Sequence, residues 1–158
     1  MLDLAAGNDL CQDSVVADNC PKDCSAAVQA AIEAAGAVGG GVVRLGVGRW
    51  YLEGPLLLPD NVRLQGAGMD RTAIYFSFRN ASNTPSTMIG AVHGTRPGDQ
   101  IYPRARFGVE DLAIYIVSHF ESVIDISPYT DGVRIQRIRL RANMFFVRKT
   151  CMLMLFSI

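Results

Sequence analysis

The sequence predicts an all-β domain of short strands preceded by one helix. Three observations lead to this prediction. A helix-forming, Ala-rich run occupies residues 25–37. Short runs rich in Val, Ile and Leu follow it, mostly bounded by glycine, proline or Asn/Asp turns. No second helical pattern separates those runs, so a doubly wound α/β sheet is disfavoured and a sandwich, a barrel or a solenoid remains.

Length and composition fit one globular domain. The chain has 158 residues, of which 49% are hydrophobic, enough for a sizeable core. The formal net charge is zero, which argues against a general nucleic-acid binder. The charge is unevenly placed, because residues 1–33 carry six acids and one lysine whereas residues 101–158 carry eight bases and five acids. The two ends are therefore expected to present different surfaces.

Neither a membrane span nor a signal peptide is predicted. The first ten residues lack a basic start followed by an apolar core. No apolar stretch reaches the roughly 18 residues that a membrane-spanning helix needs. The four cysteines are Cys11, Cys20, Cys24 and Cys151. One disulfide within the first three and free buried cysteines are both compatible with their spacing, which is not that of a zinc finger.

The helical run is the first ordered element expected. Residues 1–22 are polar and acidic without a period, and we expect an extended leader there. Asp23 offers an N-cap oxygen, and the glycines at 39–41 end the helix. Four small or aliphatic residues at helical spacing form one narrow apolar stripe: Val28, Ala31, Ile32 and Ala35. A helix with a single apolar face must cover another part of the protein.

Everything after the helix is predicted as strand. The expected strands are residues 42–45, 49–53, 55–58, 61–66, 72–76, 88–92, 109–116, 123–126 and 133–141. The segments at Val109–Ile114 and Ile135–Leu140 share the order apolar, two polar, apolar, any, apolar, and they start 26 residues apart. Such self-similarity favours a solenoid over a sandwich, because each coil of a solenoid buries its face against the next. A turn-rich insertion starts near Asn80 and runs through residues 96–104.

The first half of the chain resembles the opening of pectate-lyase-superfamily β-helix proteins. The residues that carry the resemblance are Asp23, the run Val28-Gln29-Ala30-Ala31-Ile32, Gly39 to Gly41, Gly48 to Tyr51, Gly54-Pro55-Leu56, Leu58-Pro59, Asn61-Val62 and Gly66-Ala67-Gly68. The resemblance extends to about residue 143. It implies a right-handed parallel β-helix with a short N-terminal capping α-helix, in which residues 23–146 form the N-terminal part of the β-helix domain. Residues 147–158 lose the coil pattern, and we expect an atypical tail and a truncated solenoid there.

The resemblance implies a fold more firmly than an activity. Members of this superfamily include polysaccharide lyases, glycoside hydrolases, epimerases and phage tail proteins. We expect a carbohydrate-active protein similar to a lyase or hydrolase, incomplete as an enzyme. The alternative is a non-catalytic structural, adhesion or polysaccharide-binding module. The resemblance also implies an extracellular or cell-surface location and a polysaccharide partner.

No residue is assigned a catalytic role. Lyases of the superfamily use Arg or Lys as the base, usually with calcium on an acidic cluster, and the hydrolases use grouped carboxylates. The available carboxylates are Asp99, Glu110, Asp111, Glu121, Asp125 and Asp131, and no motif places two of them on adjacent rungs of one face, apart from Glu110-Asp111, which resembles a structural feature of the family. His93 and His119 are isolated. No metal site is predicted, and calcium follows from the resemblance alone.

Three arginines and a tyrosine are the candidate substrate-binding residues. Arg137, Arg139 and Arg141 alternate with aliphatic residues, which predicts that all three side chains lie on one outward strand face. The 26-residue offset would place Asp111, Ala113 and Tyr115 beside them. Arginine binds carboxylates and tyrosine can stack on sugar rings, so such a face would suit an anionic polymer. A solvated face with an Asp111–Arg137 surface pair is the alternative, and it is the commoner arrangement.

Overall fold

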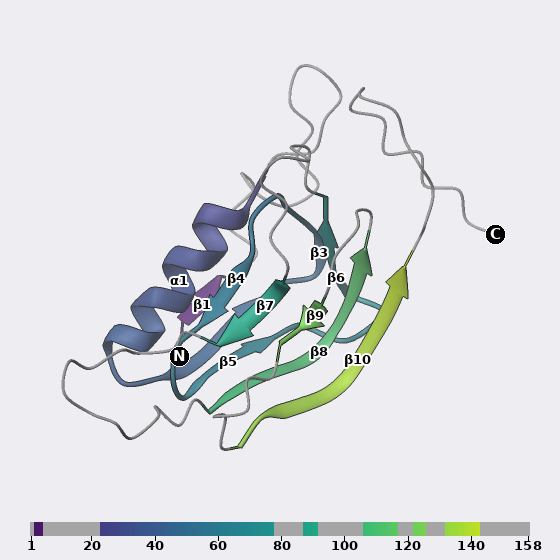
Figure 1. The fold of residues 1–158 in the computed structure, drawn as a ribbon. Coiled ribbons are helices and arrows are strands. Elements are labelled where there is room, and N and C mark those ends of the chain that lie inside the picture. The colour runs from purple at the N-terminus through teal and green to yellow at the C-terminus, as the bar shows by residue number, and fades with distance from the viewer. Residues whose placement is uncertain are drawn as a thin grey trace.

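The protein is a right-handed parallel β-helix, as predicted (Figure 1). The computed structural model describes residues 2–4, 23–77, 87–91, 106–116, 122–125 and 132–142. Every strand pairing within these ranges is parallel. A sandwich of facing antiparallel sheets is therefore excluded.

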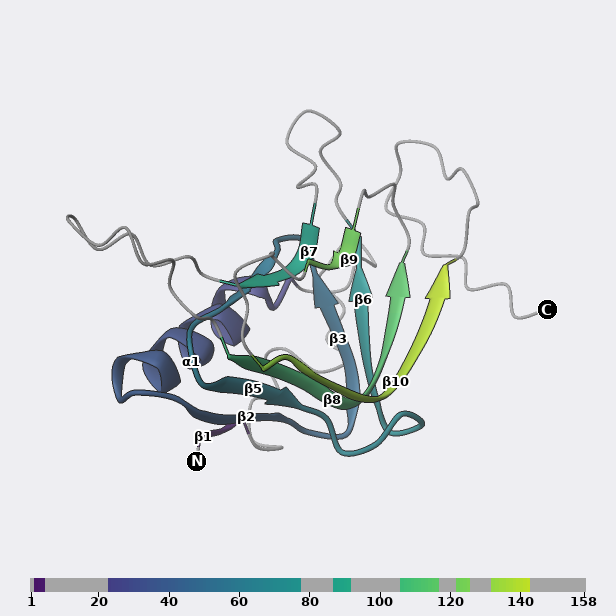
Figure 2. The same ribbon diagram turned by 60° about the horizontal axis from the view of Figure 1, so that its bottom comes forward.

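The strands form three walls, and successive strands of a wall belong to successive coils. Wall A contains β2 (Gly41–Leu45), β5 (Val62–Gln65) and the first halves of β8 (Phe107–Ile116) and β10 (Arg134–Ala142). Wall B contains β3 (Gly48–Leu52), β6 (Thr72–Phe76) and the second halves of β8 and β10. Wall C contains β4 (Leu56–Leu58), β7 (Thr87–Ala91) and β9 (Ser122–Ile124). Figure 2 shows β8 and β10 running along wall A and then bending up into wall B.

Aligned apolar side chains fill the interior. In wall A the residues in register are Val43, Leu64, Val109 and Ile135. In wall B they are Trp50, Ile74, Ile114 and Leu140. All are at most 1% exposed except the last of each row, Ile135 at 41% and Leu140 at 53%. The difference follows from stacking, because β10 is the last rung among the described strands and only β8 pairs with it there.

The 26-residue offset is confirmed for one pair of coils only. Val109 and Ile135 are register partners on wall A, as the repeat predicts. The preceding partners Val43 and Leu64 are 21 residues apart, and Leu64 and Val109 are 45 apart. A constant circuit length is therefore wrong for this chain. The long circuit contains the turn-rich insertion, most of which lies outside the described residues.

Helix α1 (Ser25–Ala37) covers the first coil with the predicted stripe (Figure 1). Val28, Ile32 and Ala35 are buried in the common core. The helix ends at the glycine run, where the N–H groups of Gly39 and Gly40 donate back to carbonyls of the last helical turn. The predicted cap is displaced by one residue. Cys24 occupies the N-cap position, and the carboxylate of Asp23 accepts the N–H of Ser25 instead.

Polar groups in the first turns of α1 and at its N-cap close the N-terminal edges of walls B and C. The Cys24 N–H donates to the carbonyl of Tyr51 on β3. The Ser25 hydroxyl accepts the N–H groups of Glu53 and Gly54 at 2.9 and 2.8 Å. The Gln29 side-chain amide accepts the N–H of Leu57 and donates to its carbonyl, as a neighbouring strand would. These contacts protect an otherwise open sheet edge from pairing with another chain.

Wall A is closed at the same end by a strand that the sequence did not predict. Leu2–Leu4 form β1, which pairs in parallel with β2 inside the segment expected to be a leader without a period. The other strand boundaries lie within two residues of their predicted positions. Cys24 is buried, while Cys11, Cys20 and Cys151 lie outside the described residues, so their pairing stays a prediction. Within the described ranges, no helix is long and apolar enough to cross a bilayer.

Candidate substrate-binding face

The candidate site begins at the corner between walls A and B. Asp111 in β8 and Arg137 in β10 both adopt left-handed backbone conformations, with φ of 61° and 49°. The ladder between the two strands skips this pair, and the alternation of side chains restarts after it. Glu110 and Asp111 therefore both point away from the core although they are consecutive. The two consecutive polar positions of the sequence repeat, Glu110-Asp111 and Gln136-Arg137, form this corner.

The predicted Asp111–Arg137 pair forms across the corner. Arg137 donates from Nε to Oδ1 of Asp111 and from Nη2 to Oδ2 at 2.8 Å, a bidentate arrangement. The side-chain amide of Gln65 in the coil below donates to the same carboxylate at 3.3 Å. The hydrogen bond from Arg137 lowers the pKa of Asp111, and the same bond raises the pKa of Arg137. The pair is therefore ionised at neutral pH.

Beside the corner, Glu110 is a carboxylate surrounded by arginines. Its side chain is 5% exposed, although it lies on the outer side of wall A. Arg63 Nη1 lies 3.6 Å from Oε1, while Arg134 Nε and Arg137 Nη2 lie 3.7 and 3.9 Å from Oε2. The arginines come from β5 and β10, the strands on either side of β8. Glu110 thus joins three successive coils electrostatically.

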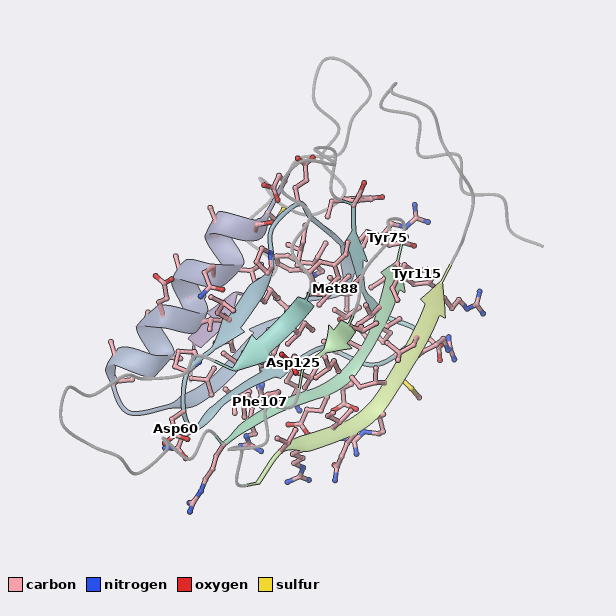
Figure 3. All side chains as sticks on the ribbon, in the orientation of Figure 1. Asp60, Tyr75, Met88, Phe107, Tyr115 and Asp125 are labelled. Carbon is pink, nitrogen blue, oxygen red and sulfur yellow. The ribbon has the colours of Figure 1, made fainter. Side chains whose placement is uncertain are left out.

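Wall B carries a stack of tyrosines on its outer side. Tyr51, Tyr75 and Tyr115 are register partners on successive coils. The ring centroids of Tyr51 and Tyr75 are 5.2 Å apart, and those of Tyr75 and Tyr115 are 4.6 Å apart with planes 9° from parallel. Figure 3 labels Tyr75 and Tyr115, which lie near each other on neighbouring strands. The guanidinium of Arg141 lies over the other face of Tyr115, 6.0 Å from its centroid. Stacking of a sugar on the Tyr115 ring is therefore blocked, and the outward ring edge with its hydroxyl remains.

The predicted arginines reach the surface at different places. Arg139 and Arg141 lie on the outer side of wall B in register with Ala113 and Tyr115, as expected from the offset. Arg137 lies at the corner rather than on the same flat face. Arg139 Nη1 forms an ion pair with Asp70, from the turn between β5 and β6. Nitrogen-tipped side chains gather along the outer side of β10 in Figure 3.

The other candidates contribute little to this face. Asp125 is exposed and directly follows β9 on wall C. Asp99, Glu121, Asp131, His93 and His119 lie outside the described residues. Within the described part of the chain, no three His, Cys, Asp or Glu side chains come together as a metal site would require.

Several members of the face were not predicted. They are Arg63 and Arg134 around Glu110, Asp70 beside Arg139, and Tyr51 and Tyr75 below Tyr115. The tyrosines are 24 and 40 residues apart, so the unequal coils hide their alignment in the sequence. The shared strand order Arg-x-Gln in Arg63–Gln65 and Arg134–Gln136 was a usable signal for two rungs of wall A.

Comparisons with known proteins identify structural relatives but no family model. No family model matches the chain, and no curated protein sequence matches it. Among solved structures, the A-module of the Azotobacter vinelandii mannuronan C-5 epimerase AlgE6 superposes with a TM-score of 0.55 and 28% identity, covering 77% of this chain and 34% of that one. The AlgE4 A-module of the same organism gives 0.54 and 26%, covering 75% and 34%. The chain thus spans about a third of their length and shares with them the right-handed parallel β-helix fold.

Proposed function

We propose that this chain belongs to a carbohydrate-active β-helix protein that binds an anionic polysaccharide containing uronic acids, and acts on it. The likeness to two mannuronan C-5 epimerase modules carries the proposal. Their identity of 26–28% accompanies the shared fold, and mannuronan is a polymer of uronic acids. We also propose an extracellular or cell-surface place of action, as the resemblance to pectate-lyase-superfamily proteins implies.

The outer side of walls A and B supports an anionic ligand. Arg137, Arg139 and Arg141 line one strand, and their side chains are at the surface. Their carboxylate neighbours Asp111 and Asp70 neutralise two of the three charges. Arg141 instead packs against Tyr115, and an aromatic neighbour leaves the full positive charge for a ligand. We therefore place the contact with a uronate carboxylate at Arg141, with the Tyr115 hydroxyl beside it.

Binding measurements test the proposal. The chain is expected to bind oligomannuronate and polygalacturonate, and not neutral dextran, in affinity electrophoresis or calorimetry. Arg139→Gln/Arg141→Gln should weaken uronate binding by about tenfold or more, because hydrogen bonds to charged groups contribute strongly. Arg106→Gln is the matched control, since it removes an exposed arginine whose described hydrogen bonds all use its backbone. Absence of uronate binding by the unaltered chain would refute the proposal.

Catalysis needs a separate readout. Proton NMR of the polymer detects inversion of configuration at C-5, and ultraviolet absorbance detects the unsaturated uronate products of a lyase. Either signal from this chain would establish an enzyme.

A non-catalytic polysaccharide-binding module is the second candidate. One observation favours it: both outer carboxylates of β8, Glu110 and Asp111, are engaged by arginines in the described part of the structure. The hydrogen bond from Arg137 lowers the pKa of Asp111, and a carboxylate with a lowered pKa is a poor proton acceptor. Binding without product in both assays would favour this candidate.

A further inference from the structure

We infer that Arg63, Arg134 and Arg137 form a preformed subsite for a carboxylate group on wall A, with Glu110 as the residue that gathers them. The inference rests on the proposed function and deepens it, because it names a second contact for the uronate chain outside wall B. Four observations carry it: the ion-pair distances, the exposure of the arginines, the bare strand between two of them, and the local charge.

The three arginines are near Glu110 without being hydrogen-bonded to it. Their nitrogen–oxygen distances of 3.6, 3.7 and 3.9 Å exceed the roughly 3.2 Å limit of a good N–H···O bond. Electrostatic attraction therefore holds the guanidinium groups near Glu110, while their N–H groups do not form hydrogen bonds with its carboxylate. Arg134 donates from Nη2 to the neighbouring Gln136. Arg137 donates from both Nε and Nη2 to Asp111, so the nitrogen that it offers a ligand is Nη1. Among the described residues, Arg63 makes only the ion pair.

The arginines are accessible whereas their anchor is covered. The side chains of Arg63, Arg134 and Arg137 are 44%, 53% and 55% exposed, and that of Glu110 is 5% exposed. A ligand would thus meet the donors and not the carboxylate. Arginine presents its N–H groups in a planar fork that matches a carboxylate.

Gly108 leaves the floor of the subsite without a side chain. It is the register partner of Arg63 on one side and Arg134 on the other. A Cβ atom at this position would lie 3.0 Å from Cγ of Arg63 and 3.3 Å from the carbonyl oxygen of Arg134. The aliphatic part of Arg63 therefore lies directly over the bare backbone of Gly108, where a larger residue would displace it.

The local charge favours an anion. Three arginines face two carboxylates, Glu110 and Asp111, so the cluster keeps one net positive charge. Arg44 adds another, since its Nε donates to Gln65 at the same corner. The ion pairs with Glu110 already keep the three guanidinium groups close together, which reduces the cost of bringing them to one ligand.

Glutamine substitutions in the full chain test the subsite. Arg63→Gln and Arg134→Gln are each expected to weaken oligomannuronate binding by about tenfold. Arg63→Lys keeps the charge but not the fork, and it should recover only part of the affinity. Arg106→Gln is again the control: it is an exposed arginine two residues before Gly108, and no described contact joins its side chain to Glu110 or to the three arginines. Its binding should stay within about twofold of the unaltered chain, and melting curves confirm that each variant is folded.

Three results would overturn the inference. The first is uronate binding by the unaltered chain that persists in Arg63→Gln and Arg134→Gln, which leaves the proposed function standing. The second is an equal loss in Arg106→Gln, which means that total charge alone matters. The third is a loss for dextran sulfate with none for oligomannuronate, which assigns the cluster to sulfate. An unaltered chain that binds no uronate removes the proposed function together with this subsite.

Discussion

Substituting Gly66 tests how closely the coils approach at the corner. An added Cβ would lie 2.3 Å from the carbonyl oxygen of Asp111, 2.8 Å from Cβ of Leu112 and 2.9 Å from Cβ of Thr72. All three are backbone or rigid buried atoms rather than flexible tips. The N–H of Gly66 also donates to the carbonyl of Glu110 at 2.9 Å, and a shift of the coil would weaken that bond.

The expected cost of Gly66→Ala follows from these contacts. Overpacking a close-packed site costs about 1–3 kcal/mol, and a weakened hydrogen bond adds about 1 kcal/mol. In a domain of this size each kcal/mol lowers the melting temperature by roughly 2–4 °C. We therefore expect a fall of roughly 4–16 °C, measured by circular dichroism.

Gly54→Ala is the matched control. Its added Cβ would lie 3.3 Å from Cβ and 3.4 Å from Oγ of Ser25, so a small shift of one side chain accommodates it. We expect a change of less than about 1 kcal/mol for this variant. If Gly66→Ala melts within 2 °C of the control, by the roughly 2–4 °C per kcal/mol that holds for this size, the coils do not approach as closely as the structure indicates.

Three further variants test the capped end and the corner pair. Ile32→Ala should lower the free energy of unfolding by about 2–5 kcal/mol in chemical denaturation, because the side chain is fully buried under α1, whereas exposed Glu33→Ala should change it by less than about 0.5 kcal/mol. Gln29→Ala removes both hydrogen bonds to Leu57, so light scattering should detect more self-association than in Ala34→Ser, a change at an exposed position of the same helix, and equal scattering would count against edge protection. The pKa of Asp111 is lowered in the fold, so its contribution to stability is present above the unfolded pKa of about 3.9 and is lost as the pH falls through the folded value. Asp111→Asn should therefore lose less stability than the unaltered chain on acidification below about pH 4, and parallel curves would contradict this.

Local patterns were enough to predict most of the elements. The helix at 25–37, its apolar stripe and its glycine end depend on neighbouring residues, and the structure confirms them. The strand positions were also correct to within two residues, because alternating burial and turn residues are local signals. The Asp111–Arg137 pair was predictable since those two coils happen to repeat at 26 residues.

Contacts between unequal coils were decided by the tertiary structure. Circuits of 21 and 45 residues place Leu64 between Val43 and Val109, and a fixed repeat length could not have predicted this register. The same inequality hid the tyrosine stack and the approach of Arg63 to Glu110. The left-handed corner at Asp111 was hidden for another reason. Two consecutive polar residues in a strand look only like an interruption of the inward–outward alternation, and the sequence does not show that the strand bends between them.

Local sequence patterns and the family resemblance were therefore enough to predict a capped solenoid of parallel strands with outward arginines on the last described rung. The fold itself was needed to learn which side chains face one another across coils, and hence that the Tyr115 ring is covered on both faces while Glu110 lies near three arginines. The physical reason is that burial and turn geometry act over a few residues, whereas the register between coils depends on the length of every intervening loop.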